Sequence, residues 1–184
     1  MVLMALVVDR VGTLARMLQL CTRKGWNVES CTVSLTEEAD VKRITLFLEC
    51  EEDPDRMARE FLALTDVLEA RALTAGQHVD RELLLVKVRV GPDGGLPPAL
   101  QAIGARIVWR QGDLAVAEAT GSHEVLNPIV VEPPPGVIEA AVTGRTCLEA
   151  GPDHISLPPE VEAERANWSG GPHPAPSPTG GVMR

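Results

Sequence analysis

The sequence predicts an α+β protein built from two successive units, of which the second is reduced. Two observations carry this prediction. Residues 1–74 show strand-like and helix-like periodicity in the order strand, helix, strand, strand, helix, strand, and the same order begins again at residue 82. This order is that of two split β-α-β units, so each unit is expected to adopt the ferredoxin-like βαββαβ arrangement, with right-handed crossovers.

The first unit is expected to begin with a buried strand and an amphipathic helix. Val2–Val8 is an almost continuous apolar run, which is typical of a buried strand. The turn-forming residues Asp9-Arg10-Val11-Gly12 end it. From Thr13 the apolar positions follow helical spacing, and the helix should end near Gly25; its apolar stripe is Leu14, Met17, Leu18 and Cys21.

The rest of the first unit also has apolar residues at the spacing that is typical of strands and helices. Asn27–Leu35 and Ile44–Cys50 have the period of two that is typical of half-buried strands. Asp53 can cap a second helix with Pro54 at its first position. Val67–Leu73 then resumes strand character, which completes a unit over residues 1–74.

A linker at residues 75–81 precedes the second unit, which is predicted over residues 82–150. An apolar strand runs to Val90, a short apolar segment spans Leu96 to Ile103, and a hairpin follows to Thr120. Only Ser122–Leu126 is expected to be helical after that, because Pro128 lacks an amide donor and the Pro133-Pro134-Pro135 run follows. Val137–Val142 should close the unit.

The remaining residues, 151–184, are rich in Pro, Gly and charge. Such a composition buries too little apolar surface to offset its ordering entropy, so we expect a disordered tail.

Composition excludes several classes of function. The net charge of −9 argues against a nucleic-acid partner, since such surfaces concentrate Lys and Arg. No run approaches the roughly 20 apolar residues that span a bilayer, so no membrane insertion is expected. The four cysteines form no CxxC pair, which favours the reducing cytoplasm. The histidines fall in linkers, turns and tail, and we expect neither a metal site nor catalytic residues.

Ligand chemistry is expected only where the first strand meets the first helix. Backbone amides at Gly12, Thr13 and Leu14 begin the helix, and unpaired amides there attract a carboxylate. Asp9 could pair with an ammonium group, so the junction suits a free α-amino acid. The alternative is an ordinary turn with Asp9 as a cap, and Asn27 could equally serve only a left-handed turn.

Five segments carry a resemblance to a known family: VVDRVGTLARM, RKGWNVESCTV, DVKRITLFLE, LTDVLEARAL and HVDRELLLVKVRV. In order and spacing they resemble the small regulatory subunit of acetolactate synthase (acetohydroxyacid synthase, AHAS). The resemblance covers about Leu3 to Val90 and implies that residues 1–74 form an ACT domain. It further implies that ACT domains pair into a homodimer and bind valine, or another branched-chain amino acid, at their interface.

The resemblance also assigns residues and partners. It maps effector contacts to Asp9 and Gly12 of one chain and to Asn27 of the other chain, and the helix amides of Thr13 and Leu14 expected above complete the candidate site. It implies a separate large catalytic subunit that carries thiamine diphosphate, Mg and FAD, with no cofactor in this chain. This chain would activate that subunit and confer feedback inhibition.

The second half departs from the family pattern, since Val142 stands where Arg is usual. Two other hypotheses therefore stay open. One is a stand-alone ACT sensor acting on another target. The other is an RNA-recognition module, which has the same element order but needs stacking aromatics, and the third strand offers only Phe47.

Overall fold

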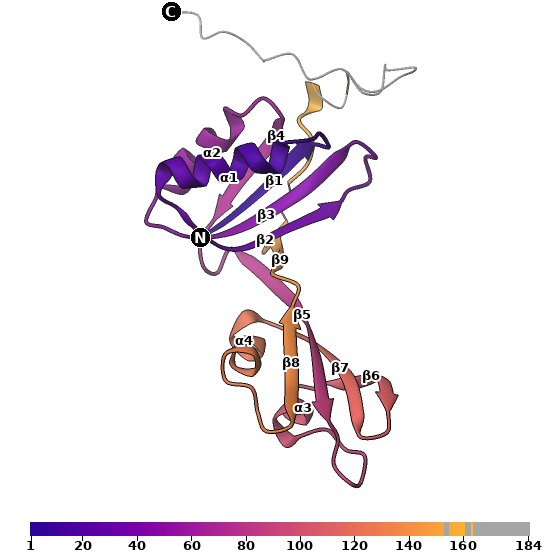
Figure 1. Cartoon of the computed structure of the whole chain (residues 1–184). Coiled ribbons are helices and arrows are strands. Elements are labelled where there is room, and N and C mark those ends of the chain that lie inside the picture. The colour runs from indigo at the N-terminus through magenta and orange to yellow at the C-terminus, as the bar shows by residue number, and fades with distance from the viewer. Residues whose placement is uncertain (153–154, 161–162, 164–184) are drawn as a thin grey trace, which may run out of the picture. The chain divides into compact units, whose positions relative to one another are not determined.

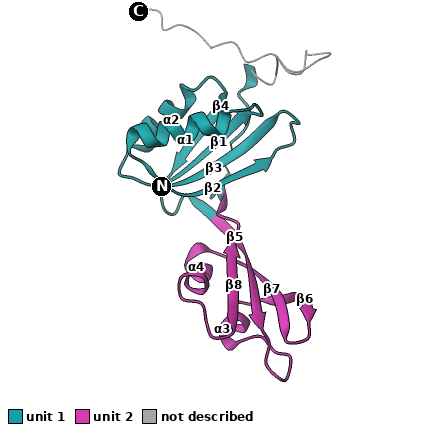
Figure 2. Ribbon diagram, in the orientation of Figure 1, with its two compact units in different colours: residues 1–79, 148–184 teal, residues 80–147 magenta. Residues whose placement is uncertain are grey.

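The computed structural model describes residues 1–152, 155–160 and 163. The chain divides into two compact units (Figure 2). Unit 1 comprises Met1–Val79 and the described residues from Leu148 onward, and unit 2 comprises Asp80–Cys147. Each unit combines helices with an antiparallel sheet, which confirms the predicted α+β fold class.

Unit 1 has a four-stranded sheet of order β2-β3-β1-β4 with two helices on one face (Figure 1). Every neighbouring pair of strands in this sheet is antiparallel. Its elements follow the predicted order: β1 (Val2–Val8), α1 (Thr13–Lys24), β2 (Asn27–Leu35), β3 (Val41–Glu49), α2 (Pro54–Leu62) and β4 (Val67–Leu73). This is the ferredoxin-like arrangement expected from the sequence.

Both faces of β1 are buried, as its continuous apolar run predicts. Leu3, Ala5 and Val7 belong to the core cluster under the helices, together with Phe61 of α2. Successive side chains of a strand point to opposite faces, so Leu6 lies on the face that carries no helix. Leu6 is nevertheless buried, which means that this second face of the sheet is also covered.

Part of that cover comes from far along the chain. Ile155 and Leu157 are buried and line a cavity with Leu6 on the helix-free face of unit 1. The expectation of a disordered tail from residue 151 did not foresee these contacts. Residues 153–154, 161–162 and 164–184 lie outside the described part of the chain.

The ends of the helices follow from local chemistry. Asp53 caps α2 as predicted, because its carboxylate accepts a hydrogen bond of 2.8 Å from the Arg56 amide. Gly25 ends α1 in the left-handed region, with φ 72°, a conformation that glycine adopts without steric cost. The chain therefore turns from α1 into β2 within two residues.

Unit 2 has the strand order β6-β7-β5-β8. Its elements are β5 (His78–Arg89), α3 (Pro98–Ala102), β6 (Arg106–Gln111), β7 (Leu114–Gly121), α4 (His123–Val131), β8 (Val137–Val142) and β9 (Thr146–Glu149), of which β5 begins and β9 ends in unit 1. The predicted hairpin and closing strand are confirmed. The strand β9, which pairs with β5, was not predicted.

The prediction that only Ser122–Leu126 could be helical is wrong. Helix α4 continues through Pro128 to Val131. A proline inside a helix removes one hydrogen bond, but Leu126 and Ile129 are buried in the core of unit 2 and offset that loss. The second unit is therefore less reduced than the sequence indicated.

Burial controls the chemistry of the cysteines, all four of which are free thiols. Burial raises the pKa of Cys21 to about 11, and it also raises the pKa values of Cys31 and Cys50. A raised pKa leaves less of the reactive thiolate at a given pH. Cys21 should therefore stay protonated throughout the neutral range.

We expect Cys21 to resist alkylation by iodoacetamide at pH 8 in the folded chain, because it is both buried and protonated. Peptide mass spectrometry after timed alkylation would measure this for each cysteine. The control is the chain unfolded in guanidinium chloride, in which Cys21 should react as fast as the other three. Rapid labelling of Cys21 in the folded chain would contradict the expected burial.

Candidate functional site

The junction between β1 and α1 has the backbone geometry of an anion site. Gly12 is the N-cap of α1, with φ 90° and ψ −8°, and no side chain caps the helix. The Thr13 amide donates to the Arg10 carbonyl oxygen at 3.2 Å, which closes the turn. A positive φ of this size is strained for any residue with a Cβ, so the turn requires glycine.

The amides of Leu14 and Ala15, in the first turn of α1, are open to a ligand. Among the described residues, none accepts a hydrogen bond from the Leu14 or Ala15 amide, whereas the Arg16 amide donates to the Gly12 carbonyl oxygen at 2.9 Å. The first turn also contains no acidic side chain. Unpaired amides at a helix N-terminus carry partial positive charge and stabilise a carboxylate placed against them.

Asp9 stands just before this turn with its carboxylate half exposed. The Lys42 ammonium of β3 lies 3.3 Å from one Asp9 carboxylate oxygen, and the Asp9 amide donates to the Asp40 carbonyl oxygen at 2.7 Å. Asp9 is therefore fixed in place beside the helix terminus. An ammonium group that binds Asp9 has to share the carboxylate with Lys42.

Arg16 and Asp66 complete the junction, and sequence reasoning missed both. Arg16 forms an ion pair with the buried carboxylate of Asp66, and its guanidinium lies 3.4 Å from the Thr13 hydroxyl. A Cβ added to Gly12 would lie 3.0 Å from Arg16 Nη1. A guanidinium thus covers Gly12 and adds a second positive group to the amides.

Thr13 and Leu14 contribute backbone rather than side chains. Thr13 is buried, and its hydroxyl donates to the Val8 carbonyl oxygen at 3.3 Å. The Leu14 side chain packs against the core cluster of unit 1. Of these two residues, only the amide of Leu14 is open to a ligand.

Asn27 is not brought to this junction within one chain. It lies at the start of β2, beyond the opposite end of α1, and its amide group donates to the Glu49 carboxylate at 3.1 Å. Twelve helical residues separate the two places, a length of about 18 Å. A site that contains Asp9, Gly12 and Asn27 therefore needs two copies of the chain.

In the described residues no helix is long and apolar enough to cross a membrane. The same residues contain no group of three or more His, Cys, Asp or Glu side chains suited to a metal ion.

Unit 1 has the ferredoxin-like fold of an ACT domain. The family model described as the AHAS small subunit-like ACT domain matches residues 3–69, which lie in unit 1. The match covers β1, the junction and α1.

Relatives of known name extend the match to both units. The chain is 32% identical to the acetolactate synthase small subunit of Mycolicibacterium smegmatis over 157 residues, which cover 83% of this chain and 92% of that one. It is 33% identical to the small subunit of Bacillus subtilis over 150 residues, 79% of this chain and 87% of that one. The chain belongs to the acetolactate synthase small-subunit family.

A solved structure supports the fold. The crystal structure of the acetolactate synthase small subunit from Thermotoga maritima superposes with a TM-score of 0.72. The alignment covers 82% of this chain and 96% of that chain, at 22% sequence identity. The two-unit α+β architecture is therefore shared with a member of the family.

Proposed function

We propose that this chain is a regulatory subunit that binds the large catalytic subunit of acetolactate synthase, raises its activity and makes it sensitive to valine or a related branched-chain amino acid. The observation that carries the proposal is the open N-terminus of α1, beside Asp9, in a chain of this family. The amides and Arg16 suit the effector carboxylate, and Asp9 suits its ammonium group.

Exposed apolar groups support pairing of two ACT domains. β2 is an edge strand of its sheet, and Val33 and Leu35 on it are exposed. Val11, inside the junction itself, is fully exposed as well. A second copy that covers these side chains would also bring its own Asn27 to the junction, which one chain cannot do.

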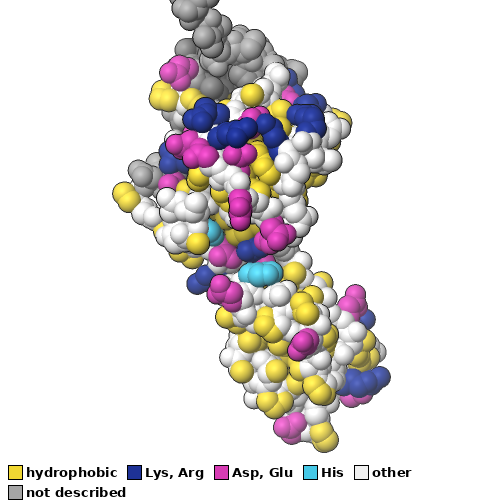
Figure 3. Space-filling view, turned by 90° about the vertical axis from the view of Figure 1, so that its left-hand side faces the viewer, with side chains coloured by type: hydrophobic (Ala, Val, Ile, Leu, Met, Phe, Trp, Pro, Cys, Tyr) yellow, Lys and Arg dark blue, Asp and Glu magenta, His cyan; other side chains and the backbone are white. Residues whose placement is uncertain are grey.

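Unit 2 offers a surface for the catalytic partner. On the face in Figure 3, charged side chains gather over unit 1 while hydrophobic ones are spread over unit 2. By the strand register, Leu85 and Trp109 lie on the same face of the unit 2 sheet, and both side chains are exposed. Large exposed apolar patches mark interaction sites.

The catalytic chemistry in this proposal belongs to the large subunit, which would hold thiamine diphosphate, Mg and FAD. This chain would act by coupling effector binding to that subunit. Such coupling is typically about 1–3 kcal/mol and acts reciprocally on binding at both sites.

Reconstitution tests the proposal. Acetolactate formation by the cognate large subunit is measured alone, with this chain, and with this chain plus increasing valine, leucine or isoleucine. We expect activation on addition of the chain and inhibition by at least one of the three. A large subunit whose activity and effector sensitivity stay unchanged would refute the regulatory role. If the chain binds an amino acid yet captures no synthase, the stand-alone sensor is correct instead.

The two-copy geometry predicts complementation between variants. Asp9→Ala and Asn27→Ala chains should each lose valine binding at the junction site, because every such site in either homodimer lacks one contact. Mixed dimers keep one intact site, with Asp9 from one copy and Asn27 from the other. After random exchange of subunits, about a quarter of the wild-type sites should return.

Equilibrium dialysis with labelled valine measures that recovery. The control is a mixture of Asp9→Ala chains that carry two different tags, which should exchange equally well and recover nothing. No recovery in the Asp9→Ala and Asn27→Ala mixture, despite proven exchange, would mean that these residues do not share a site.

A further inference from the structure

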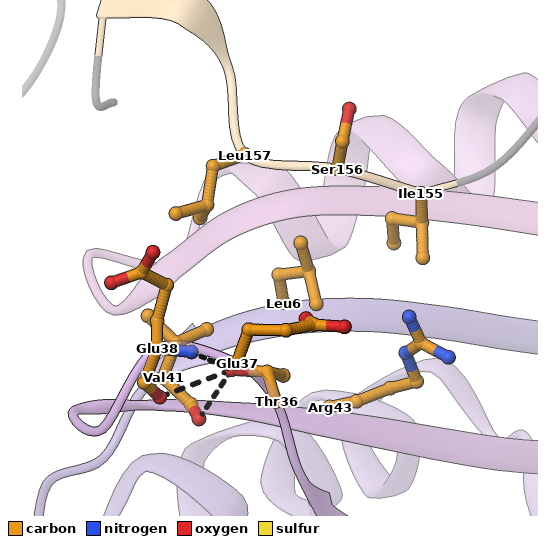
Figure 4. Close-up of a pocket in the computed structure, with 9 residues that line it drawn as sticks. All are labelled: Leu6, Thr36, Glu37, Glu38, Val41, Arg43, Ile155, Ser156 and Leu157. Atoms are coloured by element: carbon orange, nitrogen blue, oxygen red, sulfur yellow. Dashed lines mark hydrogen bonds between the residues drawn. The ribbon is translucent and has the colours of Figure 1, made fainter. Parts of the chain in front are cut away.

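A cavity of about 260 Å³ lies on the helix-free face of the unit 1 sheet (Figure 4). Its walls come from β1, β3, the connection between β2 and β3, and residues 155–157 near the end of the described chain. Pockets for drug-sized ligands measure roughly 300–1,000 Å³, so this cavity fits a smaller molecule. Its residues differ from those of the β1–α1 junction.

One side of the cavity is aliphatic. Leu6 of β1 and Val41 of β3 are buried in the sheet, and Ile155 and Leu157 face them from the later segment. Figure 4 shows Ile155 and Leu157 directed toward the sheet, with Leu6 between the two segments. These side chains suit an unbranched or branched aliphatic body.

Arg43 supplies a positive group with one unsatisfied donor. Its side chain lines the cavity, and its Nε is buried with no hydrogen-bond partner among the described residues. A buried donor without a partner is unfavourable, and a guanidinium is best satisfied by a carboxylate. The open donor therefore points to a ligand that carries a carboxylate.

Glu37 supplies the opposite charge. In Figure 4 its side chain extends along the cavity toward Arg43, yet the two form no ion pair in the described structure. The turn that carries Glu37 is held by the Thr36 hydroxyl, which donates to the Val41 carbonyl oxygen at 3.0 Å and accepts from the Glu38 amide at 3.2 Å. A cation and an anion thus line one cavity without forming an ion pair with each other.

We propose that this cavity is a second ligand site, which binds a small aliphatic zwitterion such as a free aliphatic amino acid. The carboxylate binds Arg43, the ammonium binds Glu37, and the aliphatic body lies against Leu6, Ile155 and Leu157. A simple anion is disfavoured, because Glu37 and the neighbouring Glu38 both line the cavity and outnumber Arg43. The site goes beyond the proposed function and uses none of its effector contacts.

Binding to the full chain with Asp9→Ala tests the proposal, since that change removes a contact of the junction site. The probes are L-leucine, 4-methylpentanoate, which lacks the ammonium, and 3-methylbutylamine, which lacks the carboxylate. Calorimetry should show L-leucine bound at one site per chain, at least tenfold more tightly than either analogue. No L-leucine binding in this variant, or equal binding of 4-methylpentanoate, would overturn the proposal.

Further substitutions locate the site. Arg43→Gln and, independently, Leu157→Trp should each weaken L-leucine binding at least tenfold; the second fills the cavity from the covering segment and leaves the sheet unchanged. The matched control is Asp40→Asn, which removes a charge from the same connection but not from the cavity lining. Undiminished binding in both Arg43→Gln and Leu157→Trp would overturn the proposal. Reconstitution with the large subunit is a separate measurement, so this site and the regulatory role can fail independently.

Discussion

Gly12→Asp is expected to abolish effector binding at the β1–α1 junction. The residue has φ 90°, where a Cβ is strained, and that Cβ would lie 3.0 Å from Arg16 Nη1. The new carboxylate would also occupy the region of the open helix amides and Arg16, where the effector carboxylate is proposed to bind. We expect valine affinity to fall at least about 100-fold, which corresponds to about 2.8 kcal/mol.

The control for this variant is Gly76→Asp. Gly76 also has a positive φ, 84°, but no atom lies within 4 Å of a Cβ added there. Both variants should lose roughly 1–2 kcal/mol of folding stability to the backbone strain, measured by guanidinium denaturation. In calorimetry, only Gly12→Asp should lose valine binding at the junction. Equal loss in both variants would show that strain, and not the site, is responsible.

Phe61→Ala is expected to have the largest effect on stability in unit 1. Phe61 is fully buried in the core cluster, and its ring stacks on Trp26 with centroids 5.9 Å apart. Removing a buried phenylalanine side chain costs about 3–5 kcal/mol. Because domains are stable by only about 5–15 kcal/mol, this change should bring unit 1 close to unfolding.

Leu62→Ala provides the matched control, since Leu62 is the next residue of α2 and is exposed. Removing the Leu62 side chain should lower the free energy of unfolding by about 1 kcal/mol or less, consistent with the small effects of exposed positions. Denaturant titrations followed by circular dichroism would compare the two variants. If Phe61→Ala were no more destabilising than Leu62→Ala, the packing described for unit 1 would be wrong.

The elements of unit 1 were predictable because local signals agree there. The apolar run of β1, the stripe on α1 and the Asp53 cap each act within a few residues of the chain. α4 shows where such signals fail, since Pro128 lowers local helix propensity but the burial of Leu126 and Ile129 depends on the whole unit. The sequence prediction missed strand β9 for the same reason, because only the pairing of β9 with β5 defines it as a strand.

The candidate site also has one part that local sequence predicts and one part that depends on the folded sheet. Gly12 and the open amides follow from a local turn, so the sequence predicts them. Lys42 beside Asp9, and Asp66 beside Arg16, come from other strands or turns and are brought in by the sheet. A single sequence contains no signal for pairs separated by 33 or 50 positions, so these contacts required the structure.

Ile155 and Leu157 show a different limit. The Pro- and Gly-rich composition around them predicts no independent core, and they form none. They are buried because a sheet face already exists for them to contact. The composition of a segment does not show whether two of its side chains pack against a surface that other residues form.

The position of β2 at the edge of the described sheet affects the chain before it assembles. Among the described strands β2 pairs with β3 alone, and an edge strand with exposed Val33 and Leu35 is a template for indiscriminate β-pairing and aggregation. If pairing of ACT domains covers this edge, diluting the protein exposes the edge and raising the protein concentration covers it. The melting temperature should rise with protein concentration, and newly made chains should be protected from aggregation by finding a partner quickly.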